Sequence, residues 1–178
     1  MVEQARTACD GNNRDAHGAR YRLVTEWRID APLDMIFDAL STPADWPMWW
    51  RYVDRVEAIA PGDPRGIGAV RRYTWSSRLP YRLTFDMTTT LSERPHAIEG
   101  KASGELKGIG CWRLASDGDV SCVRYTWIVD TGKRWMNVAA PLLAPLFAWN
   151  HDQVMKAGGE GLARHLGVRF IAHRRLHT

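Results

Sequence analysis

The chain has 178 residues, of which 45% are hydrophobic and 25% are charged, and its formal net charge is +4. These values are typical of one globular domain that is long enough to enclose a sizeable core. No apolar run approaches the ~20 residues that a membrane-spanning helix requires, so stable membrane insertion is not expected. The first residues also lack the apolar segment of a secretory signal, and we therefore expect a cytoplasmic protein.

The cysteines and histidines, which could bind a metal or act in covalent catalysis, do not form a recognisable motif in the sequence. Cys9, Cys111 and Cys122 are not spaced as metal ligands, and free thiols are expected in a cytosolic chain. The six histidines do not have ligand spacing either. The sequence contains no nucleophile elbow, HExxH motif or glycine-rich phosphate loop. It thus predicts no metal site and no cofactor, and it identifies no catalytic residue.

The N-terminal third begins with an irregular segment. Residues 1–19 are polar and without periodicity, which predicts a flexible N-terminal arm. From residue 21 to 30 apolar and polar side chains alternate, as in a strand with one solvated face. Pro32 suits the first turn of a short helix, and a second short helix is expected through Trp46 and Trp49.

The central part of the chain reads as consecutive strands. Turn residues bound six strand-like segments, at 53–60, 69–76, 81–92, 97–103, 106–115 and 120–130. The links between them have hairpin length, and Asp117-Gly118 is the clearest hairpin signal. Short links of this kind predict an antiparallel sheet rather than βαβ units.

A long helix is predicted from residue 136 to 166. Phe147 and Leu162 lie on its apolar face, and Asn150 and His151 fall within the same apolar arc. Both polar side chains should therefore point at whatever the helix covers. A strongly twisted sheet curls, and a helix in its concave side cannot touch it everywhere. A cavity between sheet and helix is the expected consequence.

The last ten residues carry much of the positive charge, with Arg169, Arg174 and Arg175 beside two histidines. A solvated, frayed basic tail over residues 169–178 is expected here. The sequence has neither a basic stripe nor interleaved basic and aromatic residues, so no nucleic-acid partner is expected.

Several segments together carry a family resemblance: Ile29–Pro32 with Ile36–Leu40, Trp46–Trp50, Gly66 and Gly68, Gly104–Leu114, Val123–Trp127, and Asn150–Asp152 with Met155. On these segments the chain resembles the SRPBCC superfamily, the START-like helix-grip proteins that include polyketide cyclase/dehydrase-like and lipid-transfer members. The resemblance covers about residues 20–167, and it divides the chain into an arm (1–19), a domain (20–168) and a tail (169–178).

The resemblance implies an α+β helix-grip fold of the START/Bet v 1-like type. In that fold a seven-stranded curved antiparallel sheet wraps around the long C-terminal helix, and two short helices follow the first strand. It also implies a hydrophobic tunnel between sheet and helix. The fold alone does not name a ligand, because function depends on the site and not on the architecture.

Aromatic and polar side chains of the strands and the long helix are the expected wall of this tunnel. Arg71 shares a strand face with Tyr73 and Trp75, and a buried guanidinium needs an anionic partner, either Glu99 or a ligand carboxylate. Stacked aromatic rings suit a flat apolar ligand. The predicted ligand-binding residues are Trp27, Trp49, Arg71, Tyr73, Trp75, Phe85, Trp112, Tyr125, Trp127, Phe147, Asn150 and His151.

We therefore expect a protein that binds or transports a small hydrophobic molecule, whether lipid-like, polyketide-like or aromatic. The alternative is an enzyme of the polyketide cyclase/dehydratase type that uses the same cavity, with His151, Tyr73 or Tyr125 in general acid/base roles. A third hypothesis is a protein-interaction module, for which the tryptophan cluster near residue 49 is the candidate surface.

Overall fold

The computed structural model describes residues 20–78, 81–130 and 134–176. The predicted N-terminal arm lies outside the described residues. In chain order the elements are β1 (Arg20–Ile29), α2 (Leu33–Ser41), η1 (Pro43–Asp45), α3 (Trp46–Trp49), β2 (Val53–Ala60), β3 (Val70–Trp75), β4 (Leu83–Glu93), β5 (Ala97–Gly104), β6 (Lys107–Asp117), β7 (Val120–Asp130), α4 (Arg134–Leu166) and β8 (Phe170–Leu176).

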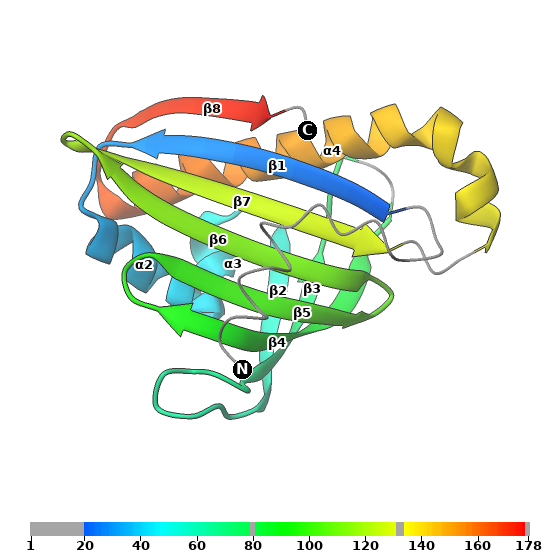
Figure 1. The fold of residues 1–178 in the computed structure, drawn as a ribbon, viewed down its shortest axis with the longest axis horizontal. Helices are drawn as coiled ribbons and strands as arrows, with labels where there is room; N and C mark the ends of the chain where they lie inside the picture. The colour runs from blue at the N-terminus through cyan, green and yellow to red at the C-terminus, as the bar shows by residue number, and fades with distance from the viewer. Residues whose placement is uncertain (1–19, 79–80, 131–133, 177–178) are drawn as a thin grey trace.

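One curved sheet contains all the described strands, in the order β2-β3-β4-β5-β6-β7-β1-β8. Neighbouring strands are antiparallel throughout. At the β6–β7 hairpin Asp117 pairs with Val120, and Gly118 between them has a φ of 64°, as the predicted tight turn requires. Figure 1 shows α4 running behind the sheet, with α2 and α3 grouped at one end. The predicted helix-grip arrangement is confirmed.

The short helices close one end of the curved sheet. Pro32 precedes α2, and Asp34 lies in its first turn, where a carboxylate favours the positive end of the helix dipole. Ile36, Phe37 and Leu40 are buried on the inner side of this helix. The apolar spacing of α2 therefore fixes which of its faces covers the sheet.

Three glycines in the second half of α4 allow aromatic side chains to approach its backbone. A Cβ at Gly158 would lie 2.3 Å from Trp50 Cε2, and one at Gly161 would lie 1.9 Å from the Trp49 carbonyl oxygen. Gly159 faces the ring of Phe170 in the same way. This glycine-rich surface lets α3 and β8 pack against α4 at close range.

The C-terminal segment differs from two expectations. Residues 170–176 form a strand instead of a frayed tail, and the sheet therefore has eight strands instead of seven. Gly167, with a φ of 69°, ends α4, and the amide of Val168 donates to the Ala163 carbonyl in a C-terminal capping pattern. The chain then returns along β1, where Arg174 pairs opposite Glu26. Just before this strand, Arg169 forms an ion pair with Asp30 at the end of β1, a partner that is distant in sequence and that composition alone does not show.

The cysteines provide another correction. Cys111 of β6 is disulfide-bonded, whereas Cys122 of β7 is free. The expectation of free thiols is therefore wrong for Cys111. Spacing along the chain could not show this, because disulfide formation depends on which cysteines the fold brings within reach.

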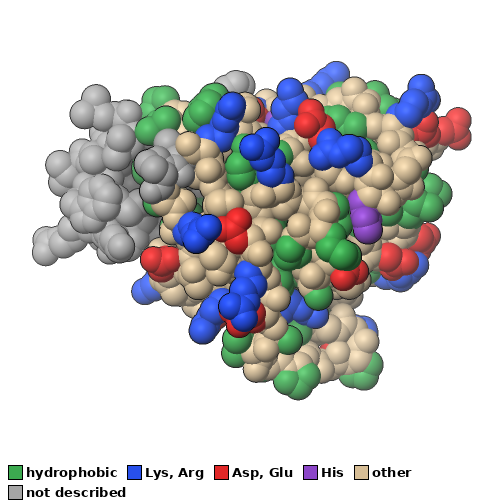
Figure 2. Space-filling model, turned by 180° about the vertical axis from the view of Figure 1, so that it is seen from behind, with side chains coloured by type: hydrophobic (Ala, Val, Ile, Leu, Met, Phe, Trp, Pro, Cys, Tyr) green, Lys and Arg blue, Asp and Glu red, His purple; other side chains and the backbone are tan. Residues whose placement is uncertain are grey.

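The surface gives no sign of a single-sign charged face on the side that carries α4. There, basic and acidic side chains are interspersed among hydrophobic ones (Figure 2). No helix of the described residues is both long and apolar enough to cross a bilayer. Within the same residues, His, Cys, Asp and Glu side chains do not gather in a group of three that could hold a metal ion.

Candidate functional site: an aromatic cavity with one unpaired arginine

A cavity of about 130 Å³ lies between the concave face of the sheet and the helical end of the molecule. Strands β3 to β7, the short helices and Met155 of α4 contribute to its wall. The exposed side chains of Ser41 and Arg65 line it as well, on the α2 and β2–β3 sides. Its aromatic lining consists of Trp46, Trp50, Tyr73, Trp75, Phe85, Trp112 and Tyr125.

The aromatic rings of the wall hold one another in place. Trp112 and Tyr125 have ring centroids 4.3 Å apart, and Trp50 meets Trp75 edge-to-face at 5.0 Å. Aromatic pairs at such separations add stability beyond the area that they bury. The Trp50 indole also donates a 2.9 Å hydrogen bond to the Val154 carbonyl of α4. The wall is therefore preformed rather than assembled by a ligand.

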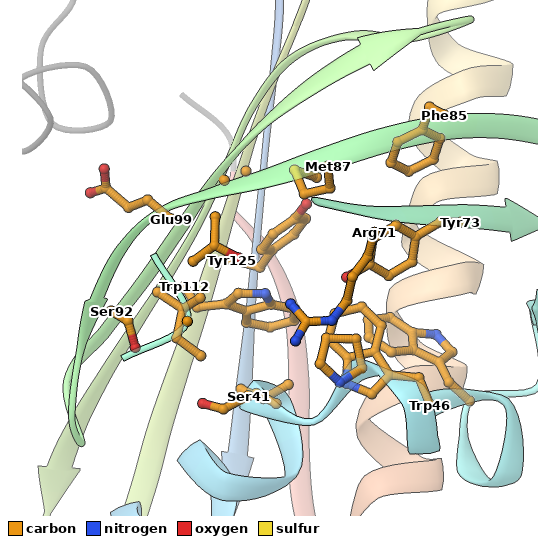
Figure 3. A pocket seen from close by; sticks show the side chains of 18 of the residues that line it. Ser41, Trp46, Arg71, Tyr73, Phe85, Met87, Ser92, Glu99, Trp112 and Tyr125 are labelled. Carbon is orange, nitrogen blue, oxygen red and sulfur yellow. The ribbon is translucent and has the colours of Figure 1, made fainter. Parts of the chain in front are cut away.

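Arg71 is the cationic side chain that extends from β3 into this aromatic space. In Figure 3 its guanidinium lies amid the lining side chains, between Trp112 and Trp46. Among the described residues it has no ion-pair or hydrogen-bond partner. Arg71 is partly buried, and a guanidinium that is partly withdrawn from bulk water normally has an anionic partner. The cavity thus contains an unsatisfied positive charge.

Glu99 is not the partner of Arg71. It pairs with Arg113, and in Figure 3 its carboxylate points away from Arg71. The β5–β6 register explains this, because Glu99 lies opposite Cys111 while its neighbour Ile98 lies opposite the inward-facing Trp112. The sequence allowed either Glu99 or a ligand carboxylate as the partner of Arg71, and the structure excludes Glu99.

Besides Arg71, the cavity has three further hydrogen-bond donors in Trp75, Tyr73 and Tyr125, while Glu99, which is paired with Arg113, also lies in its lining. The buried indole nitrogen of Trp75 has no partner. Burial raises the pKa of Tyr73, although the nearby Arg71 acts in the opposite direction. Burial, followed by the neighbouring Tyr73, also raises the pKa of Tyr125. Both phenols are therefore protonated at neutral pH and can donate to an acceptor.

The structure brings half of the twelve predicted residues to this cavity: Arg71, Tyr73, Trp75, Phe85, Trp112 and Tyr125. The other half lie elsewhere. Trp27, Trp49 and Trp127 are buried in the core beside the cavity, and none of them lines it. Phe147, Asn150 and His151 on α4 do not line it either.

Asn150 and His151 face the sheet, as predicted, but stand behind the cavity wall. The His151 ring stacks against Tyr125 at a centroid distance of 6.4 Å, and Tyr125 separates it from the cavity. Burial lowers the pKa of His151 to about 4. The Asn150 side chain is 9% exposed, and its Oδ1 atom has no partner. The sequence placed the two residues on the correct helix face, but it could not show the layer of rings in front of them.

Sequence reasoning missed several cavity residues, among them Trp46, Trp50, Met87 and Met155. Two signals could have found some of them. Trp46 and Trp50 are four positions apart in a helical segment and so lie on the same side of it. Met87 follows Phe85 by two positions in a strand and must point to the same side.

Three solved structures illustrate the likeness in fold. TTHA0849 from Thermus thermophilus has a TM-score of 0.68 at 14% identity, covering 82% of this chain and 99% of that one. Major latex-like protein 151 from Panax ginseng has a TM-score of 0.65 at 11% sequence identity, and the match covers 83% of this chain and 98% of that one. The Zhui aromatase/cyclase from Streptomyces sp. R1128 has a TM-score of 0.61 at 13% sequence identity, and the match covers 83% of this chain and 96% of that one. At these identities the likeness shows the fold alone.

Among curated proteins, no sequence matches the chain significantly. A family model does match, over residues 20–167, and its description is polyketide cyclase / dehydrase and lipid transport. That span contains every side chain of the cavity wall. The chain therefore belongs to the polyketide cyclase / dehydrase and lipid transport family.

Proposed function

We propose that this protein binds a small hydrophobic molecule, with aromatic character, in the cavity between its sheet and its helices. The observation that carries the proposal is the preformed aromatic wall, with Trp50, Trp75, Trp112 and Tyr125 around one space. Concave sites with apolar walls and a few convergent polar groups are typical of small-molecule binding. Family membership supports the same class of function.

The magnitudes indicate that the apolar wall and the polar donors have different roles. Burying about 200 Å² of ligand surface at ~25 cal/mol per Å² would contribute about 5 kcal/mol. Association itself costs on the order of 4–15 kcal/mol in lost freedom. Apolar burial alone would thus give weak affinity, and hydrogen bonds from the donors in the cavity must add to it.

The cavity tryptophans make binding measurable. Four of them, Trp46, Trp50, Trp75 and Trp112, line the site, so an occupant should change the indole emission. Native mass spectrometry of protein purified from its own host should also show a retained apolar compound. Absence of a retained compound, together with unchanged emission across a panel of small aromatic compounds, would contradict the proposal.

A blocking variant links the signal to this cavity. Ser41→Trp introduces a bulky ring beside the lining of the cavity and should abolish the emission change. Ser103→Trp is the matched control, because Ser103 is exposed on β5 and does not line the cavity. Loss of the signal in both variants would assign it to non-specific quenching.

A second candidate is an enzyme of the polyketide cyclase/dehydratase type. The observation that favours it is that two titratable phenols, Tyr73 and Tyr125, line the same cavity as Arg71. Because their pKa values are raised, they would serve as general acids rather than bases at neutral pH. Turnover of a polyketide-like chain that is lost in Tyr125→Phe would support catalysis, whereas binding without turnover would support a carrier.

A further inference from the structure

We propose that the ligand is a single-ring aromatic carboxylate, whose carboxylate pairs with Arg71 while its ring lies between the aromatic walls. This inference rests on the proposed function and narrows it from hydrophobic molecules in general to one chemical class. Two independent properties of the cavity, its volume and its charge, carry the argument.

The volume limits the ligand to about one ring. The cavity measures about 130 Å³, and a protein cavity of about 150 Å³ is known to accommodate benzene. Its walls cannot recede easily, since Trp50 is hydrogen-bonded to α4 and packed against Gly158. A fused-ring or long-chain compound would have to displace these rings.

The charge selects for an anion. Arg71 has no protein partner among the described residues, and Glu99 is paired with Arg113. A guanidinium presents a planar fork of donors that matches a carboxylate with two parallel hydrogen bonds. A neutral ring would leave this cation unsatisfied in an aromatic environment, whereas an aromatic carboxylate satisfies both the ring walls and the charge.

The remaining donors fit the same class of ligand. The Trp75 indole nitrogen is buried without a partner, and Tyr73 and Tyr125 line the same space. These three donors favour an occupant with several acceptor atoms. A carboxylate provides two oxygens with about four lone-pair positions.

The test uses three probes at neutral pH, each followed by tryptophan emission and calorimetry. Benzoate is the expected ligand type, benzamide has the same shape without the charge, and 1-naphthoate has the charge on two fused rings. The wild-type protein should bind benzoate at least about tenfold more tightly than either of the others, since hydrogen bonds to charged groups are the stronger ones.

Variants assign the preference to one residue. Arg71→Met should remove the preference for benzoate over benzamide while leaving benzamide binding within about threefold. Arg72→Met is the matched control, since Arg72 is the next residue of β3 and pairs with Asp86 on the opposite face. This variant should prefer benzoate over benzamide as strongly as the wild type does. If Arg71→Met does not fold, Arg71→Lys should retain a weaker preference, because an ammonium lacks the planar fork.

The outcomes separate the two proposals. Equal affinity for benzoate and benzamide, or tighter binding of 1-naphthoate, would overturn this inference and leave the binding function intact. Binding of none of the three probes would overturn the inference as well. It would count against the proposed function only together with the absence of any retained compound in native mass spectrometry.

Discussion

The indole of Trp50 lies against the bare backbone of Gly158, so closely that a Cβ at Gly158 would stand 2.3 Å from the Trp50 Cε2 atom. The same indole donates to the Val154 carbonyl of α4 and forms part of the cavity wall. One contact therefore docks the short helix α3 onto α4 and fixes a wall of the candidate site. The stability of the fold and the shape of the cavity therefore depend on the same pair of residues.

Substitution of Gly158 by Ala should destabilise the fold by about 1–3 kcal/mol, because the added methyl group must displace the Trp50 ring. The intrinsic helix propensity of Ala would favour the variant by only about 1 kcal/mol. Urea unfolding measures the difference. The control is Lys156→Ala, at an exposed position of the same helix, which should change stability by less than about 0.5 kcal/mol. A Gly158→Ala variant as stable as the wild type would contradict the close packing.

The stability of the protein should fall as the pH decreases from about 6.5 to 4. Burial lowers the pKa of His151 to about 4 in the folded state, against 6.5 for the unperturbed side chain. Between these values the unfolded state binds more protons, so acid favours unfolding. The expected loss is about 1–2 kcal/mol, less than the free energy that corresponds to the whole shift in pKa, because part of the His151 side chain still contacts solvent.

Urea midpoints at several pH values test this dependence. His151→Gln should flatten the slope between pH 6.5 and 4, whereas His165→Gln, at an exposed position of the same helix, should retain it. An unchanged slope in His151→Gln would assign the dependence to other groups.

Removal of Arg113 should cost about 2–3 kcal/mol of stability. Its partner Glu99 is 2% exposed, and a carboxylate left buried without its cation is strongly unfavourable. The double variant Glu99→Leu with Arg113→Met should recover much of the loss, since it removes both charges. A double variant less stable than Arg113→Met, as measured by urea unfolding, would show that the pair contributes more than charge compensation.

Met87→Ala should enlarge the cavity and change its selectivity. The truncation removes a flexible side chain from the cavity wall at a cost of about 2 kcal/mol. Emission titrations should then show 1-naphthoate gaining affinity relative to benzoate. Met48→Ala, at a 69% exposed residue outside the cavity, should alter neither stability nor selectivity. An unchanged preference in Met87→Ala would mean that cavity volume does not limit the ligand.

Phe170→Ala should destabilise the protein by about 2 kcal/mol, because this ring packs on the core beside Gly159. Ile171→Ala is the matched control: it is the next residue of β8, and its side chain is 46% exposed. Thermal unfolding of the two variants compares the faces of the strand. Equal, negligible effects would indicate that the C-terminal segment contributes nothing to the fold.

Much of the architecture could be predicted because it depends on local periodicity. The alternation in residues 21–30 and the Asp117-Gly118 turn predicted strands and a hairpin that the structure contains. The long helix was predicted within two residues of its start at Arg134. The eighth strand escaped prediction, because its pairing partner β1 is more than a hundred residues away and its basic side chains resembled a solvated tail.

By itself the sequence determined the elements other than β8, the family, and the strand face that Arg71 shares with Tyr73 and Trp75, since these depend on patterns within single segments. Only the tertiary structure decided which aromatic residues enclose the cavity and which fill the core. Trp27 and Trp112 lie in contact, with ring centroids 5.2 Å apart, yet only Trp112 lines the cavity. Trp27 also packs against Gly159 of α4, so the helix fills the space in front of its ring. Likewise, only the register of β5 and β6 assigned Glu99 to Arg113 and left Arg71 unpaired.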